Sequence, residues 1–167
     1  MWNMGTERLK DLLGDLSGGA RLKMTELLTG YQRGKEALAE VIAGFDAASV
    51  CRECGGLCCR NGKYRMNVCD VLARIEAQVL TLADFTRKPV CPYGTETGCT
   101  MEPGLRPADC ILFICDAIEQ KLPLRAISNL AIQERALREC IREVSCLTGE
   151  QAGTPLLLWA ENGGERS

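Results

Sequence analysis

The sequence of 167 residues contains no histidine. Its absence removes the commonest general base near neutral pH and every metal site that depends on imidazole. Aromatic residues make up only 5% of the chain, which leaves few side chains to stack on nucleic-acid bases. The net charge of −2 offers no excess of positive charge to phosphates either. We therefore expect no nucleic-acid partner and no histidine-based metal site.

Long apolar runs are also missing. No stretch reaches the roughly 18 apolar residues that a membrane-spanning helix needs. The chain runs from Met1 into charged residues from Glu7 onward, without the apolar core of a signal peptide. These absences predict a cytoplasmic protein with no membrane partner. Because cytoplasmic thiols are kept reduced, clustered cysteines favour metal binding there, with a mainly disulfide-bonded chain as the alternative.

Cysteine, by contrast, is abundant, with 11 residues in the chain. Eight of them fall into two batches of four, namely Cys51, Cys54, Cys58 and Cys59, and then Cys91, Cys99, Cys110 and Cys115. In the first batch, Gly55 and Gly56 follow a Cys-x-x-Cys pair, and glycine permits a sharp turn that directs both sulfurs to one ion. This spacing is typical of tetrahedral zinc or iron sites. We predict that these eight cysteines are metal ligands.

The cysteine spacing does not determine which metal binds or how many sites the eight thiolates form. One four-thiolate site with spare thiols, two such sites, and one bridged binuclear site are all compatible with the spacing. We expect zinc, with iron or an iron–sulfur cluster as the alternative. Four thiolates around a divalent ion leave a charge of about −2, and Arg106 is the candidate cation of the second shell. Cys110 and Cys115 can bind one ion only if the predicted helix breaks between them or starts later.

The other three cysteines are weaker candidates for metal binding. Cys140 adjoins Ile141 in an apolar helical stripe, so we expect a buried structural thiol there. Cys69 and Cys146 are likewise expected to be packing residues.

Hydrophobic periodicity predicts an all-α protein in three parts. Residues 1–48 form a helical hairpin that starts at an N-cap, Thr6, and 49–122 hold an irregular cysteine-cluster loop layer. Residues 123–167 form a C-terminal helix and tail that pack on this layer. A heptad stripe in the first part comprises Met24, Leu27, Tyr31, Leu38, Val41 and Phe45, with Gly34 at a weak position. The stripe packs within its own domain or forms a seam with a second copy or another protein.

The remaining helices are predicted from caps and stripes. Asn67 caps a helix with apolar residues from 68 to 79, and Pro107 suits the first turn of another that extends to 118. A last long helix spans about 124–147 and stops at Gly149, before a short docking helix at Leu156–Trp159. No strand pattern rises above this helical signal.

The cysteine pattern resembles the YkgJ-type family of zinc- or iron-chelating domains, whose hallmark is a CxxCxxCC cluster followed by further cysteines and an Arg-Pro-x-x-Cys segment. The matching residues are Cys51, Cys54, Cys58, Cys59, Cys91, Cys99, Arg106 to Cys110 and Cys115. Asp70-Val71 and Asp84-Phe85 also resemble the family's spacing. Three residues, Gly55–Leu57, separate the second and third cysteines here, where the family has two. The resemblance covers about residues 50–118 and implies metal chelation.

Three functions follow as hypotheses. The first is a cytoplasmic metal-binding protein whose site is structural or serves metal handling. The second is an iron–sulfur enzyme or accessory protein in redox or methyl-transfer chemistry, because flagellin lysine-N-methylases carry a similar cysteine region. The third is a protein-interaction module whose metal only holds the scaffold.

Overall fold

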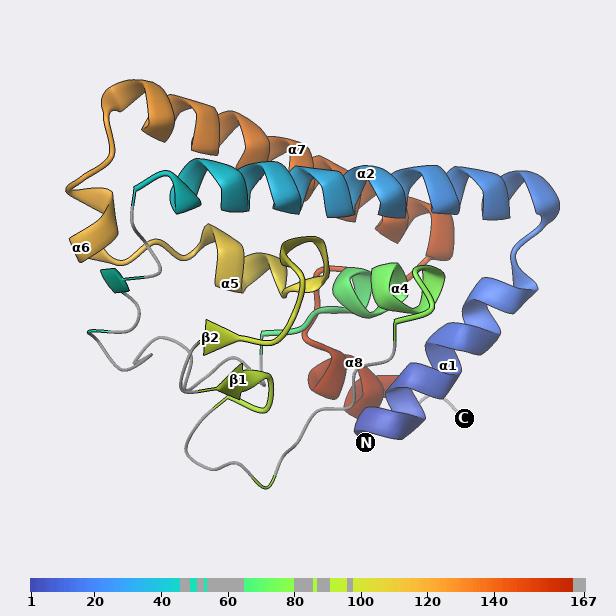
Figure 1. Cartoon of the computed structure of the whole chain (residues 1–167). Helices are drawn as coiled ribbons and strands as arrows, with labels where there is room; N and C mark the ends of the chain where they lie inside the picture. The colour runs from blue at the N-terminus through green and yellow to red at the C-terminus, as the bar shows by residue number, and fades with distance from the viewer. Residues whose placement is uncertain are drawn as a thin grey trace.

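The computed structural model of the chain describes residues 1–45, 49–50, 53, 65–79, 86, 91–95 and 98–163. Within these ranges the chain is mostly helical, which confirms the expected all-α class (Figure 1). The strands β1 and β2, of two residues each, form a small antiparallel hairpin that the sequence pattern did not predict. The elements are α1 (Trp2–Asp15), α2 (Gly18–Ala43), α4 (Val68–Glu76), β1 (Gly94–Thr95), β2 (Gly98–Cys99), the 3₁₀ helix η2 (Pro103–Leu105), α5 (Ala108–Leu112), α6 (Asp116–Glu119), α7 (Leu124–Thr148) and α8 (Leu156–Asn162).

The long helices α2 and α7 lie side by side and run in opposite directions (Figure 1). The apolar stripe of α2 is buried at Met24, Tyr31 and Leu38, and that of α7 is buried at Leu137 and Val144. The other three residues of the heptad stripe, Leu27, Val41 and Phe45, are only partly buried. Neither these two helices nor any other described helix is long and apolar enough to cross a membrane.

Gly34 permits a close approach between α2 and α7. A Cβ atom at this position would lie 2.9 Å from Leu137 Cδ2, closer than carbon atoms pack. The position that looks weak in the heptad pattern is therefore the one that admits Leu137. Gly30, one turn earlier on the same helix, has no atom within 4 Å of its corresponding Cβ position.

The first helix, α1, diverges from α2 and packs on α8 and α4 (Figure 1). Leu9 and Leu13 are buried in this contact region. The expectation that Thr6 is the N-cap is wrong, because the helix already begins at Trp2. The Thr6 hydroxyl instead donates a hydrogen bond to the Trp2 carbonyl at 3.0 Å, as hydroxyls inside helices do. The division of the chain into three parts stays a prediction.

The helix α4 begins at its predicted cap, Asn67. The Asn67 side chain accepts a hydrogen bond from Asp70 N, and the Asp70 carboxylate accepts one from Asn67 N, which together make a capping box. The helix ends at Glu76 rather than at 79. Its first turn is tied to the segment after α7, because Cys69 N donates to Ala152 O at 2.9 Å.

The C-terminal part agrees with the sequence pattern. The helix α7 ends at Thr148, and Gly149 adopts a left-handed backbone with φ of 72°, the usual helix stop. The short helix α8 then docks through Leu156 and Trp159, both of which are buried.

Candidate metal centre

Two cysteines of the second batch lie at the β1–β2 hairpin. Cys91 precedes the hairpin and is buried, whereas Cys99 is the last residue of β2 and is exposed. Cys99 pairs with Gly94, and Thr100 N donates to Tyr93 O at 2.9 Å, so the pairing continues past the strands. The hairpin therefore carries both cysteines at its open end.

The other two cysteines flank a break in the chain. Cys110 lies in α5 and is exposed, and Cys115 is the N-cap of α6. The expectation of one helix through residue 118 is wrong, since Phe113 adopts an extended backbone after α5. The aromatic Phe113 and β-branched Ile114 are weak helix formers, which favours a break here. This break meets the condition under which Cys110 and Cys115 can bind one ion.

These four cysteines do not form a metal site by themselves. In the part of the chain that the structure describes, no three histidine, cysteine, aspartate or glutamate residues come together as a metal-binding group. The predicted ligands of the first batch, Cys51, Cys54, Cys58 and Cys59, lie outside the described residues. The eight-cysteine ligand set therefore stays a prediction.

The Asp70 carboxylate joins the elements that carry the second batch. Its side chain has no solvent exposure. Asp70 Oδ1 accepts hydrogen bonds from the Tyr31 hydroxyl at 3.0 Å, from Lys35 Nζ at 3.0 Å and from the backbone N–H of Ala108 at 3.2 Å. Ala108 is the first residue of α5. Asp70 thus holds the start of the helix that carries Cys110 against α2 and α4.

Lys35 extends this network toward the hairpin. Its side chain is also fully buried, and Nζ donates to the Arg106 carbonyl at 2.8 Å. Arg106 Nε in turn donates to the Met101 carbonyl at 2.9 Å. Arg106 therefore links the segment after Cys99 to the start of α5. Its predicted role as a second-shell cation stays a prediction.

Arg74 places a second positive charge next to the cysteine hairpin. Its guanidinium carbon lies 5.3 Å from the centre of the Tyr93 ring, and the side chain is 4% exposed. Tyr93 is 2% exposed, and its hydroxyl has no hydrogen-bond partner in the described part of the chain. Burial raises the pKa of Tyr93, the Arg74 charge lowers it, and Cys91 and Cys99 add smaller upward effects. A buried hydroxyl donor and a cation thus lie close to two predicted ligands.

The three remaining cysteines occupy different environments. Cys69 is fully buried, as expected of a packing residue, and Cys140 is partly buried against the same core. Cys146 is exposed, so the expectation that it packs is wrong. It lies on the outer face of α7, two residues after the buried Val144.

Sequence patterns missed the residues that organise this region. Lys35 lies four residues after Tyr31 and three before Leu38, on the apolar face of α2. A lysine on the apolar face of a predicted helix indicates a buried charge, because a lysine is buried only when a partner neutralises it. The sequence around Arg74 gives no comparable indication, because Arg74 contacts the ring of Tyr93, which lies in a different segment of the chain.

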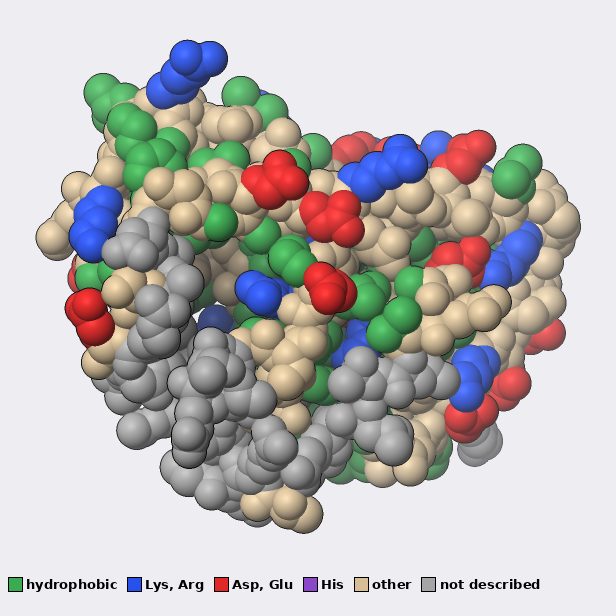
Figure 2. Space-filling view, viewed as in Figure 1, with side chains coloured by type: hydrophobic (Ala, Val, Ile, Leu, Met, Phe, Trp, Pro, Cys, Tyr) green, Lys and Arg blue, Asp and Glu red, His purple; other side chains and the backbone are tan. Residues whose placement is uncertain are grey.

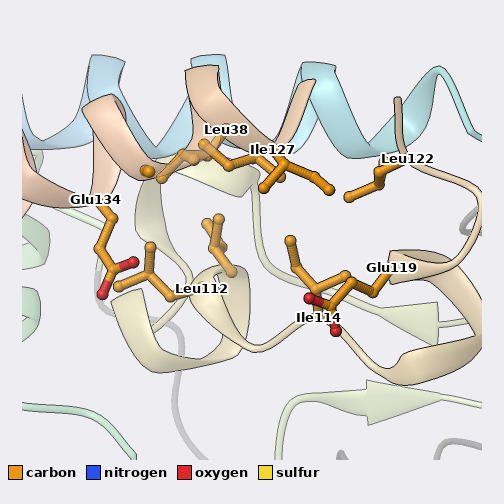
Figure 3. Close-up of a pocket in the computed structure, with 10 residues that line it drawn as sticks. Leu38, Leu112, Ile114, Glu119, Leu122, Ile127 and Glu134 are labelled. Atoms are coloured by element: carbon orange, nitrogen blue, oxygen red, sulfur yellow. The ribbon is translucent and has the colours of Figure 1, made fainter. Parts of the chain in front are cut away.

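A shallow groove lies between α2, α5, α6 and α7 (Figure 3). Its volume is about 240 Å³, and its lining is apolar apart from two carboxylates, Glu119 and Glu134, which lie toward opposite ends of the view. The Glu134 carboxylate is paired with Arg138 at 2.6 Å. Figure 2 shows hydrophobic side chains exposed near the start of α7, where Leu124 is 83% exposed. The groove contains no predicted metal ligand.

Comparisons with known proteins add no further constraint. No family model, no curated protein and no solved structure matches this chain. The resemblance to the YkgJ-type family therefore stays a prediction from the cysteine pattern.

Proposed function

We propose that the chain is a cytoplasmic metal-binding protein of the YkgJ type that holds zinc through cysteine thiolates. The metal has a structural or metal-handling role. The proposed ligands are Cys51, Cys54, Cys58, Cys59, Cys91, Cys99, Cys110 and Cys115. Because no three candidate ligands in the described ranges come together, the proposed site draws thiolates from both batches.

The observation that carries the proposal is the buried Asp70 network under the second batch. It connects the first residue of α5 to α2 and α4, and through Lys35 and Arg106 it reaches Met101, two residues after Cys99. A network of this kind fixes the backbone on which Cys99 and Cys110 are mounted. Pre-positioned ligands reduce the entropy lost when a metal binds.

The available groups fit a thiolate-bound metal. With no histidine in the chain, sulfur is the soft donor present, and four thiolates leave a divalent site with a charge of about −2. Arg74 supplies a buried positive charge against the ring of Tyr93, two residues after Cys91, and Tyr93 supplies a hydroxyl donor. Hydrogen bonds and cations in these positions stabilise thiolate ligands. When bound, zinc would crosslink the two batches of cysteines.

Serine substitutions test the ligand set. Metal content is measured on purified Cys54→Ser and Cys110→Ser proteins, with Cys146→Ser as the matched control because its thiol is exposed on α7. We expect the first two variants to lose zinc and the control to keep the full amount. Full zinc content in both Cys54→Ser and Cys110→Ser would overturn the proposed site.

A further inference from the structure

Exposed apolar side chains border the groove between α2, α5, α6 and α7. Phe113 lies in sequence between two lining residues, Leu112 and Ile114, and is 52% exposed. Ile127 lines the groove and is still 39% exposed, and Leu124, one turn earlier on α7, is more exposed still. Apolar side chains gathered around a groove mark an interaction surface, whereas scattered ones do not.

The groove is too small and too shallow for a small-molecule site. Its volume of about 240 Å³ is below the roughly 300–1,000 Å³ of ligand pockets. Its two carboxylates, Glu119 and Glu134, lie toward opposite ends (Figure 3), so they do not converge on one ligand group. A protein surface that covers the apolar middle fits the groove better.

The wall that α7 contributes carries the pattern of a helix–helix contact. Leu124, Ile127 and Ala131 are exposed, and they follow one another at intervals of three and four residues. This spacing places them in one narrow stripe, the arrangement by which two helices pack along a seam. Glu134 continues the stripe and ends it with a charge. The exposed face of α7 therefore suits a second helix with the same stripe.

Each end of the groove carries charges of both signs. At one end, Glu119 lines the groove, and the exposed Lys121 follows two residues later. At the other end, Glu134 pairs with Arg138. A partner with one sign of charge at both ends would meet a like charge at each. A two-fold axis exchanges the ends, so each carboxylate of one copy faces a basic side chain of the other.

We propose that two copies of the chain associate through this groove, with the α7 stripe of one copy packed antiparallel against that of the other. The two-fold axis passes close to Ile127, which lies between the two carboxylates (Figure 3). Lys121 of each copy then faces Glu134 of the other, and Arg138 faces Glu119. This dimer is independent of the proposed metal site, because the groove contains no proposed ligand.

Sedimentation velocity over a range of protein concentrations tests the inference on the full chain. A reducing agent is present throughout, because oxidation of the 11 cysteines would crosslink copies without this interface. We expect the wild type to shift, as its concentration rises, from the mass of one chain to that of two. A wild type that stays monomeric throughout the series would overturn the proposal and leave the groove to a different protein.

Three variants locate the interface, and circular dichroism checks that each folds as the wild type does. Ile127→Asp and Leu124→Asp place a charge in the proposed seam and should raise the dimer dissociation constant about tenfold or more. Leu124 is the first residue of α7 and is largely exposed, so an aspartate there favours the helix and leaves the core intact.

Leu22→Asp is the matched control. Leu22 is 64% exposed near the start of α2, which lies at the opposite end of the molecule from the start of α7 (Figure 1). This variant should leave the dissociation constant unchanged. A dimer of wild-type affinity in both Ile127→Asp and Leu124→Asp would overturn the proposal, as would a dimer that Leu22→Asp weakens equally.

Discussion

Lys35 Nζ and Asp70 Oδ1 lie 3.0 Å apart, and neither side chain is exposed to solvent. The pair joins the middle of α2 to the first turn of α4. Both charges have further partners, since Asp70 accepts from Tyr31 and Lys35 donates to the Arg106 carbonyl. A buried ion pair overcomes its desolvation only with such extra hydrogen bonds.

Removal of one partner from this pair should destabilise the fold strongly. We expect Lys35→Met to lower the free energy of unfolding by about 3–5 kcal/mol, because it leaves the Asp70 charge buried without its cation. Urea denaturation followed by circular dichroism measures the change. Lys23→Met is the control, since Lys23 is 54% exposed and 3.5 Å from Glu143; it should cost less than about 1 kcal/mol. Equal losses in the two variants would contradict the role of the pair.

Two glycines on α2 should respond oppositely to alanine. Gly30→Ala meets no neighbouring atom, so it should stabilise the protein by about 0.5–1 kcal/mol through helix propensity alone. Gly34→Ala places a methyl group 2.9 Å from Leu137 Cδ2 and should destabilise by roughly 1–3 kcal/mol as the packing of α2 and α7 adjusts. Thermal or urea unfolding measures both. A stabilising effect of Gly34→Ala would contradict the close approach of Leu137 to Gly34.

The buried tyrosine of the network predicts an alkaline loss of stability. Burial, and then the charge of Asp70, raise the pKa of Tyr31 well above its ordinary value of 10.0. As the pH rises, the Tyr31 hydroxyl therefore loses its proton at a lower pH in the unfolded chain than in the folded chain. Its contribution to the free energy of unfolding is complete below about pH 10 and declines as the pH rises further.

Comparison with Tyr31→Phe isolates this contribution. The variant should unfold at lower urea concentration at neutral pH, because the hydrogen bond to Asp70 is gone. Above about pH 10 its free energy of unfolding should decline less steeply than that of the wild type, by up to about 1.4 kcal/mol per pH unit. Parallel alkaline curves for the two proteins would contradict the raised pKa.

Tyr93 should affect metal binding more than folding. Its buried hydroxyl has no partner among the described residues, so Tyr93→Phe should leave the stability of the metal-free protein unchanged or slightly higher. If the hydroxyl donates to a ligand thiolate, the variant should bind zinc about tenfold or more weakly. Competition with a chromogenic chelator measures the affinity. Wild-type affinity in Tyr93→Phe would remove this residue from the proposed site.

Much of the helical framework could be predicted from local sequence. Asn67 caps α4 and Gly149 ends α7 because the chemistry of caps and stops involves only nearby residues. The stripe around Tyr31 was recognisable because buried residues recur with the helical period. Thr6 was misassigned because a hydroxyl can bond inside a helix as well as at its start.

The network under the candidate centre could not be predicted in the same way. Burial of Lys35 depends on Asp70 and on the Arg106 carbonyl, which lie 35 and 71 positions away in the sequence. The sequence around Gly34 does not indicate that Leu137 of α7 is its neighbour. Contacts of this kind arise from how the helices pack, so they became visible only in the folded chain.

Metal and acid-labile sulfide content of anaerobically purified protein, measured together with a visible spectrum, tests the central claim most directly. A single four-thiolate site with spare thiols, or two such sites, predicts about one or two zinc ions per chain, no sulfide and no visible absorption. Iron with a matching amount of sulfide and a brown colour would contradict the zinc assignment and favour redox or methyl-transfer chemistry. Protein that contains neither metal, and binds none when zinc is added under reducing conditions, would contradict the proposed function itself.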